Sequence, residues 1–428
     1  MEYSTMETLS KSKNGLETLR PVYRYIRIGG DILRLAVPVC AMLLAGICSA
    51  DSPVGSSLDT AFCKPALDVA EVQLDGFRKA YPDPSKIARA YENDQPKMVE
   101  TKDWTSGFVS GSFWYMYEYT QDPGWLASAE RWTAQLESQK NNTRTHDVGF
   151  IMFNSYGNGL RLTGNEAYKP VLVQSADSLM TRYSPVVGAT RSWDFGTWGF
   201  PVIIDNMMNL ELLYSASQMT HDQRYADAAT THASTTLKNH FRPDDSSYHV
   251  VDYDPETGAV VHKQTHQGIS DDSAWSRGQA WGLYGFTSVY RFTRDEQFLR
   301  QAQNIAEFYL NNPNLPDDMV PYFDFDVPND PDIENFRDSS AAAVAASGLL
   351  ELAAYVPEPQ ASRYREAALD MLRSLASPAY SAETGSNGYF LLKHATGRWQ
   401  ANDEVDAALN YADYYYLEAL IRCKNLDN

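Results

Sequence analysis

One turn signature recurs four times in this chain and constrains its architecture more than any other feature. Each copy reads Thr-x-[Asp/Asn]-x-x-aromatic and closes a long amphipathic run, and its threonine is Thr120, Thr163, Thr220 or Thr293. The apolar residues before each threonine recur at helical spacing, and the Asp or Asn that follows can cap another helix. Each copy therefore predicts two helices joined by a tight turn, as in a repeat of helical hairpins.

The starts of the first helices carry chemically reactive or aromatic side chains. Counting back 16 residues from the repeated threonine reaches Trp104, Asp147 and Arg277, and counting back 15 residues from Thr220 reaches Asp205. If the hairpins close into a ring, all first helices run the same way, and their N-terminal ends converge on one funnel. We predict that this funnel is the functional site.

Two further segments fit the same plan without the threonine signature. A fifth unit begins at residues 337–340 and continues into the run AAAVAASGLLELAAYV, and a sixth pairs NYADYYYLEALIR near the C-terminus with FCKPALDVAEVQLDGF near the start. Although 428 residues could hold two or three average domains, glycine and proline cluster only in short turns, so no linker is evident. The sequence predicts an all-α fold with a single catalytic domain over residues 51–428.

Composition excludes one class of partner and favours another. The formal net charge of −19 repels nucleic acid and anionic membrane surfaces, so we predict no nucleic-acid binding. Aromatic residues make up 12% of the chain, which suffices for a sizeable core and also suits stacking on sugars, although most of these rings are expected to be core residues.

The N-terminal region resembles an export signal. Six basic residues precede an apolar stretch over residues 35–47, which is too short to span a bilayer. We therefore predict that residues 1–50 are a signal peptide with an N-terminal extension, cleaved after Ala50. The mature protein would be periplasmic or secreted, without a transmembrane segment, and lipidation of Cys48 is the alternative.

Export would leave two cysteines in the mature chain, Cys63 and Cys423. Two cysteines cannot form a tetrahedral metal site alone, and no HExxH or CxxC pattern occurs, so no metal or cofactor is predicted. Because the first and last helices of a closed ring are neighbours, a disulfide between these cysteines is a hypothesis. A Cα separation well above about 7 Å would exclude it.

Asp205 and Asp147 are the candidate catalytic carboxylates, because nearby inward-facing carboxylates are the usual groups that cleave glycosidic linkages. The alternative for Asp205 is an ordinary N-cap or first-turn residue of its helix. A helix N-terminus lowers the pKa of a carboxyl, whereas a general acid must hold its proton at neutral pH. We expect burial by Trp193, Trp198 and Phe200, together with an ionised Asp147, to raise the pKa of Asp205. One carboxyl would then be protonated and the other charged.

The densest polar and aromatic cluster lies between residues 248 and 282. We expect Arg277 at an exposed helix start, where its fork of donors could hold a carboxylate, so Arg277→Ala should keep its fold and lose productive substrate use. Trp275 and Trp281 could stack on a sugar face. For each residue a structural role is the alternative, and Trp281 in particular is at helical spacing from Arg277 and could be core.

Four strings in these regions resemble glycoside hydrolase family 88, the unsaturated glucuronyl hydrolases. They are HDVGF from residue 146, FPVIIDNMMNLELL from 200, YHVVDYDPETG from 248 and THQGxxDDSAWSRGQAWGLYGF from 265. The resemblance extends from about Trp104 to Gly388, and RGQAWG distinguishes this family from the related unsaturated rhamnogalacturonyl hydrolases of family 105. It implies an (α/α)6 barrel, in agreement with six helical hairpins.

The resemblance also implies an activity and a set of site residues. The family removes the non-reducing Δ4,5-unsaturated uronic acid that polysaccharide lyases leave on oligosaccharides, by hydrating a vinyl ether without a metal. The proton donor and water activator corresponds to Asp205 and its partner carboxylate to Asp147. The positions expected to line the sugar site are Trp104, His146, His249, Gln267, Trp275, Arg277, Trp281 and Tyr389.

Three other functions remain open at this point. An unsaturated rhamnogalacturonyl hydrolase or an ordinary inverting glycosidase could use the same barrel, the latter with carboxyls about 6.5–9.5 Å apart. A non-catalytic oligosaccharide-binding protein would need only the aromatic funnel, and the paired carboxylates argue against it. The parent polysaccharide, its sulfation and the oligomeric state are not predicted.

Overall fold

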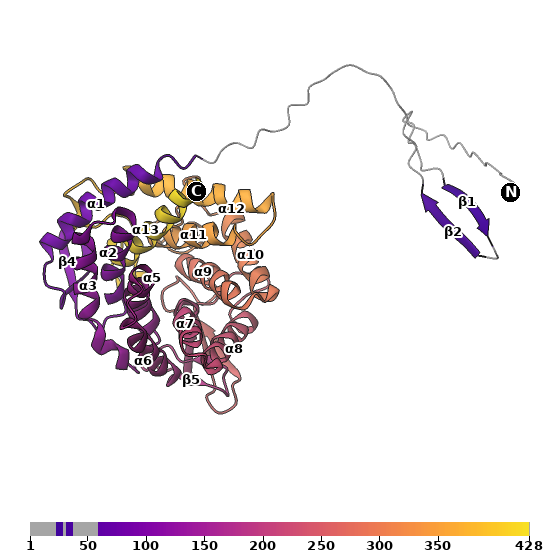
Figure 1. The fold of residues 1–428 in the computed structure, drawn as a ribbon, viewed down its shortest axis with the longest axis horizontal. Helices are drawn as coiled ribbons and strands as arrows, with labels where there is room; N and C mark the ends of the chain where they lie inside the picture. Colours follow the sequence, from indigo (N-terminus) through magenta and orange to yellow (C-terminus); the bar gives the residue numbers. More distant parts are fainter. Residues whose placement is uncertain (1–22, 29–30, 37–58, 428) are drawn as a thin grey trace, which may run out of the picture. The chain divides into compact units, whose positions relative to one another are not determined.

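The predicted helical hairpins are present in the computed structural model, which describes residues 23–28, 31–36 and 59–427. Within the unit Leu58–Asn428, inner helical segments pair with outer helices (Figure 1). In each pair the inner segment comes first: α2 (Ser106–Thr120) with α3 (Pro123–Ala134); α4 (Val148–Met152), the π-turn η2 (Phe153–Gly157) and α5 (Asn158–Thr163) with α6 (Tyr168–Met180); η3 (Ile204–Asn209) and α7 (Leu210–Thr220) with α8 (Gln223–Asn239); α9 (Ser276–Thr293) with α10 (Glu296–Asn311); α11 (Ser339–Leu352) with α12 (Gln360–Ala376); and α13 (Asn410–Lys424) with α1 (Cys63–Ala80).

The inner segments close into a ring. Helix α13 packs against α2 and α11, α11 packs against α9, and α9 packs against α7 and η3. Helix α4 contacts both α2 and α7, which completes the circuit. The predicted (α/α)6 barrel is confirmed. Short 3-10 turns lie between the hairpins and at the end of the chain: η1 (Glu137–Asn141), η4 (Val327–Asn329), η5 (Asn387–Tyr389), η6 (Trp399–Ala401) and η7 (Asn425–Asp427).

The recurring threonine signature makes the same set of hydrogen bonds in every turn. After α2, the Thr120 hydroxyl donates to the Met116 carbonyl at 2.7 Å and accepts from the Asp122 N–H at 3.1 Å. The Asp122 carboxylate accepts from the Gly124 N–H at 2.7 Å, while Gln121 adopts a left-handed conformation with φ of 57°. The other three turns repeat these bonds. The motif therefore ends one helix and caps the next.

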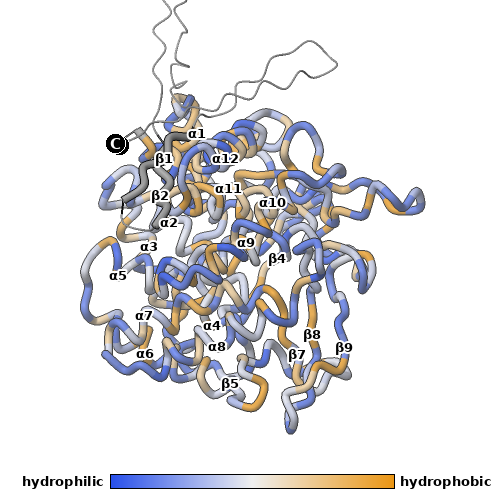
Figure 2. The backbone as a smooth tube through the Cα atoms, turned by 90° about the vertical axis from the view of Figure 1, so that its right-hand side faces the viewer, coloured by the Kyte–Doolittle hydropathy of each residue, from blue (hydrophilic) through white to orange (hydrophobic). Residues whose placement is uncertain are grey.

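Short antiparallel strands, which the all-α prediction did not include, are inserted between the hairpins. Strands β7 (Phe200–Ile203), β8 (Val250–Tyr253) and β9 (Val260–Gln264) form one sheet (Figure 2). A second sheet has the order β10 (Ala408–Leu409), β3 (Ile87–Glu92), β4 (Gln95–Val99), and β5 (Tyr183–Ser184) pairs with β6 (Ala189–Thr190).

The β7–β8 register positions two site residues. Ile203 lies opposite Val250, and the Ile204 N–H donates to the His249 carbonyl at 3.1 Å. The residues that follow β7 therefore lie beside those that precede β8. This pairing brings His249 next to Asp205, although the two are 44 positions apart in the sequence.

The unit Met1–Ser57 contains one described hairpin, in which β1 (Tyr23–Ile28) pairs antiparallel with β2 (Asp31–Ala36). The predicted cleavage point after Ala50 and the alternative lipidation site Cys48 lie outside the described residues. Among the helices of the described segments, none combines the length and hydrophobicity needed to cross a membrane.

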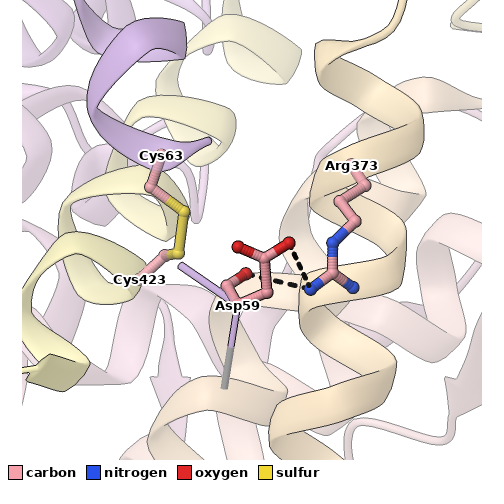
Figure 3. Close-up of a disulfide and its surroundings, with 4 residues drawn as sticks. All are labelled: Asp59, Cys63, Arg373 and Cys423. Atoms are coloured by element: carbon pink, nitrogen blue, oxygen red, sulfur yellow. Dashed lines mark hydrogen bonds and ion pairs between the residues drawn. A yellow bond between two sulfur atoms is a disulfide. The ribbon is translucent and has the colours of Figure 1, made fainter. Parts of the chain in front are cut away.

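A disulfide joins the first and last helices of the ring. Cys63 at the start of α1 is bonded to Cys423 near the end of α13, with a Cα separation of 6.3 Å (Figure 3). Both residues are fully buried, and the backbone carbonyl of nearby Asp59 accepts from Arg373 of α12 at 2.9 Å. The hypothesis of a Cys63–Cys423 bond is confirmed.

Replacing both cysteines, as C63S/C423S, is expected to lower the free energy of unfolding by about 2–4 kcal/mol, because the bond restricts the unfolded chain. The two residues are 360 positions apart, so reduction frees a very long loop. Denaturant titration with and without a reductant measures the effect. The reductant should destabilise the wild type and leave the double variant unchanged; equal stability of the two proteins under oxidising conditions would contradict the prediction.

Candidate active site

The N-terminal ends of the inner helices converge, as the funnel hypothesis requires. Asp147 is the residue before α4, and Asp205 lies in the first turn of η3. Arg277 opens α9 and binds Asp338, the N-cap of α11, with 2.5 Å between Nη1 and Oδ2. Residues from four separate hairpins therefore lie in one region of the ring.

Asp205 faces a histidine whose protonation pattern is set by the backbone. Its Oδ2 lies 3.7 Å from Nε2 of His249, and neither atom has a hydrogen-bond partner among the described residues. Nδ1 of His249 accepts from the backbone N–H groups of His266 and Gln267, each at 3.1 Å. Burial lowers the pKa of His249 well below its usual value, so the ring is neutral and its proton is on Nε2. A neutral N–H group is therefore directed at Asp205.

Asp147 has a comparable histidine partner. Its Oδ1 lies 3.2 Å from Nε2 of His146, and its Oδ2 accepts from the Thr145 hydroxyl at 2.5 Å. Burial lowers the pKa of His146 to about 3, so this ring is also neutral. The Asp147 side chain makes no capping hydrogen bond to α4. Its side-chain partners are His146 and Thr145.

Both carboxyls have raised pKa values. Burial raises the pKa of Asp205 to about 7, with the Arg277 cation opposing the rise and the Asp147 anion adding to it. Burial also raises the pKa of Asp147 to about 7, with the Thr145 hydrogen bond opposing it. The rise expected for Asp205 is present, and the structure adds a similar rise at Asp147, because desolvation acts on both carboxyls. Either group can hold a proton near neutral pH.

The aromatic residues expected to bury Asp205 occupy other places. Phe200 belongs to a small apolar cluster on the sheet, and Trp198 donates its indole N–H to Gln264 at 2.7 Å. The Trp193 ring approaches His249, with 6.4 Å between ring centroids. The indole N–H of Trp281 on α9 lowers the pKa of Asp205, although it makes no hydrogen bond of normal geometry with the described residues.

Arg277 is buried, contrary to the exposed helix start that the sequence suggested. Its side chain is 1% exposed, and Nη1 donates to Asp338 and to the Thr396 carbonyl at 2.6 Å. Nη2 donates to the Gly397 carbonyl at 2.7 Å, and the guanidinium lies over the Trp275 ring at 4.6 Å. Arg277 therefore anchors the segment around residue 397 against α9 and α11. This correction follows from a non-local ion pair that spacing along one helix cannot reveal.

The three candidate tryptophans differ in accessibility. Trp281 is fully buried and packs against Phe150, with 5.4 Å between ring centroids, so the core role holds and stacking on a sugar does not. Trp275 is 2% exposed, and its ring lies tilted against that of His249 with 4.5 Å between centroids. Trp104 is only partly buried and packs beside Tyr411 at 5.0 Å. Of the three, Trp104 retains an accessible surface at the site.

Gln267 joins the site and Tyr389 does not. The Gln267 amide donates to the Gly397 carbonyl at 2.9 Å, the same acceptor that Arg277 uses. The Tyr389 ring packs instead on outer helix α1, where a Cβ at Gly76 would lie 2.3 Å from it. The expectation that Tyr389 lines the sugar site is therefore not supported by its position.

Two site residues were not identified from the sequence. Asp338 was placed at a helix start but given no role. Asn209 lies in the string IIDNMMN and contacts residues of both carboxylate segments. Only its position one helical turn after Asp205 could have indicated it.

A separate hollow of about 250 Å³ lies between α1, α12 and the segment near residue 391. Its lining is largely apolar and contains no carboxylate or histidine, so we assign it no catalytic role. In the described part of the chain, no group of three or more His, Cys, Asp or Glu side chains is arranged to hold a metal ion.

Comparisons with known proteins agree with this geometry. The model of Glycosyl Hydrolase Family 88 matches residues 83–418. An unsaturated glucuronyl hydrolase of Formosa agariphila is 48% identical over 332 residues, which cover 77% of this chain and 82% of that protein. An unsaturated chondroitin disaccharide hydrolase of Streptococcus pneumoniae is 36% identical over 359 residues, covering 82% and 88%.

Solved structures of unsaturated glucuronyl hydrolases are also similar to this chain. The crystal structure of an unsaturated glucuronyl hydrolase specific for heparin is similar with a TM-score of 0.82 at 46% identity, covering 86% of this chain and 98% of that one. The family match spans most of the chain, and the sequence relatives cover well over two thirds of it. The chain is a glycoside hydrolase and belongs to glycoside hydrolase family 88.

Proposed function

We propose that this protein removes the non-reducing terminal Δ4,5-unsaturated uronic acid from oligosaccharides by vinyl ether hydration, with Asp205 as general acid and base. One observation carries the proposal: Asp205 is buried with a pKa of about 7 and faces the neutral His249 ring at the converging helix starts. A carboxyl with this pKa can give up a proton and recover it at neutral pH. The names of the relatives support the same substrate class.

The chemistry requires a single proton-transfer group. Protonated Asp205 donates its proton to C4 of the C4=C5 double bond, and positive charge develops at C5 and the ring oxygen. Water adds its oxygen to C5 and gives a proton back to the Asp205 carboxylate, so the enzyme is regenerated. The resulting hemiketal opens to a C5 ketone, and the hemiacetal at C1 then releases the remaining sugar as an alcohol. The sum is the addition of one water molecule.

The assay follows the conjugated alkene itself. Incubation with lyase-generated unsaturated disaccharides should abolish their ultraviolet absorbance as the double bond is consumed. An inverting glycosidase acting on saturated sugars would release sugar from saturated disaccharides and leave the alkene intact. A binding protein would leave the alkene intact and release no sugar. Because relatives are named for chondroitin disaccharides and for heparin, the panel should include sulfated and unsulfated members of both classes.

Asp147 is proposed to keep Asp205 protonated at neutral pH through its negative charge. The Asp147→Asn variant is expected to lose activity on the order of 10²-fold. The alkaline limb of its pH–rate profile should also lie at a lower pH than that of the wild type. The Asp147 anion raises the pKa of Asp205, so removing that charge lowers this pKa, and the protonated acid is lost at a lower pH. A pH–rate profile of kcat/KM measures the shift.

Asp370→Asn is the matched control for this variant. Asp370 lies on outer helix α12 and pairs with Arg373, and its side chain is more than half exposed. The control removes one negative charge at a distance from the site, so its profile should match the wild type. An Asp147→Asn profile with an unchanged alkaline limb would contradict the assigned role.

We also propose that the protein is exported, in periplasmic or secreted form. The basic and apolar pattern before residue 50 supports this, and so does the Cys63–Cys423 disulfide, since such bonds persist mainly in oxidising compartments. Sequencing the N-terminus of the protein recovered from its native host tests it; an intact Met1 in the mature protein would contradict cleavage.

A further inference from the structure

Asn209 is a buried amide located between the segments that carry the two carboxylates. It is 1% exposed, and its Oδ1 accepts from the backbone N–H of Phe150 at 2.8 Å. A backbone N–H can only donate, so this bond identifies which end of the amide is the oxygen. The opposite end, Nδ2, lies 3.3 Å from Nδ1 of His146.

The orientation of this amide determines the tautomer of His146. An amide nitrogen can only donate, so Nδ1 of His146 must accept. The proton of the neutral ring is then on Nε2, which lies 3.2 Å from Oδ1 of Asp147. The same Nδ2 of Asn209 also lies 3.4 Å from the backbone carbonyl of Asp205, one helical turn earlier. One side chain thus contacts both halves of the site.

The backbone is shaped for this contact. A Cβ added to Gly149 would lie 2.6 Å from Cα of Asn209 and 2.5 Å from its Oδ1. Only a residue without a side chain allows the start of α4 to approach η3 this closely. The HDVGF and IIDNMMN strings therefore meet at Gly149 and Asn209.

The two site histidines reach the same protonation pattern by different means. In His249, Nδ1 is held as an acceptor by two backbone N–H groups, which only a substitution by proline would remove. In His146, the only partner of Nδ1 among the described residues is the Asn209 side chain. A single substitution can therefore release one histidine and leave the other as an internal reference.

We propose that Asn209 is a positioning residue for hydrolysis. It holds His146 with the proton on Nε2, so that Asp147 receives a hydrogen bond, and it ties the Asp147 segment to the turn that carries Asp205. Its effect on turnover rests on the proposed function, whereas its effect on the histidine tautomer does not. Hydrogen-bond partners that orient metal-ligating histidines contribute about 10- to 100-fold to activity, and we expect a similar contribution here.

The test uses Asn209→Leu, which keeps the approximate shape of the side chain and removes its donor and acceptor. Nitrogen NMR of histidine-labelled protein distinguishes protonated from bare ring nitrogens, and the spectrum of His146→Gln assigns the His146 signals. In Asn209→Leu, the His146 signals should leave the Nε2-protonated pattern, while those of His249 stay. With an unsaturated disaccharide, kcat/KM should fall about 10- to 100-fold.

Asn158→Leu is the control for the loss of a buried amide. Asn158 lies on inner segment α5, is 8% exposed, and donates to the Asn154 carbonyl and the Tyr414 hydroxyl without contacting a histidine. It should lose stability and keep both histidine patterns. If Asn209→Leu does not fold, Asn209→Asp supplies the measurement, because its carboxylate accepts at the His146 Nδ1 position and should protonate that nitrogen.

The outcomes separate the parts of the proposal. An unchanged His146 pattern in folded Asn209→Leu or Asn209→Asp would overturn it, as would a changed pattern with wild-type kcat/KM. If the wild type does not consume unsaturated disaccharides, the proposed function fails and the contribution to turnover fails with it. The NMR result would still decide whether Asn209 sets the tautomer.

Discussion

The Asp205→Asn variant is expected to lose about 10²- to 10⁴-fold in kcat/KM while it still folds and binds substrate, because a neutral amide cannot donate a proton to carbon. Steady-state assays on an unsaturated disaccharide measure the loss, and calorimetric titration measures the retained binding. A folded variant with near wild-type turnover would remove Asp205 from the chemistry.

The same variant is expected to be more stable than the wild type at alkaline pH. Burial raises the pKa of Asp205 from 3.8 to about 7, so the folded state binds a proton that the unfolded state has already released between these values. Stability is therefore lost as pH rises from about 4 to about 7, and the full loss, about 4 kcal/mol, is present above pH 7. Asp205→Asn removes this cost, so its advantage should appear at pH 8 and vanish near pH 4.

Asp252→Asn is the matched control for the stability measurement. Asp252 is 6% exposed on β8, and its carboxylate accepts from the N–H groups of Phe200 and Gly199. Its replacement removes charge-assisted hydrogen bonds, so this variant should be less stable than the wild type at pH 8. Thermal unfolding at both pH values compares the two variants. Destabilisation of both at pH 8 would contradict the account given for Asp205.

The second large effect is expected at Arg277, where truncation should destabilise the fold by about 3–5 kcal/mol. Arg277→Ala leaves the Asp338 carboxylate, which is 0% exposed, without its cation and removes the hydrogen bonds that Arg277 donates to the carbonyls of Thr396 and Gly397. The sequence alone suggested an intact fold with poor substrate use; the buried ion pair predicts loss of both. Denaturant titration followed by circular dichroism measures the change.

A double variant tests whether the unpaired Asp338 carboxylate causes the loss of stability in Arg277→Ala. Replacing both partners, as R277M/D338L, removes the unpaired buried charge and should recover part of the stability that Arg277→Ala loses. Any residual activity of Arg277→Ala should persist to higher pH, because the Arg277 cation holds down the pKa of Asp205. A single variant as stable as the wild type would show that the ion pair contributes nothing.

The fold could be predicted because it is built from a local repeat. The bonds made by Thr120 and Asp122 involve only residues within four positions, so the sequence carries them completely. Closure of the ring and the cysteine pairing then followed from the count of hairpins. The short strands could not be predicted in this way, since the pairing of Ile203 with Val250 joins segments of different hairpins.

The sequence identified most residues of the candidate site, but it did not predict all of their contacts and pKa values. Asp147, Asp205 and His249 were named from position and motif, and the structure brings them to one region. Their pKa values and the burial of Arg277 depend on which side chains surround them, and that is decided by contacts across the ring. Asn209 was missed because its partners Phe150 and His146 belong to another hairpin, so nothing near it in the sequence indicates its hydrogen bonds.

The Cys63–Cys423 bond makes the barrel a closed covalent loop. Residues 63 to 423 have no free end, so a single cut in any surface turn, such as the one after Gly164, would open the loop without releasing a fragment. Each hairpin would remain held by two neighbours and by an unbroken covalent path around the other side. In the exported form proposed above, where proteases are present, such a loop makes the first cleavage tolerable and only the second one destructive.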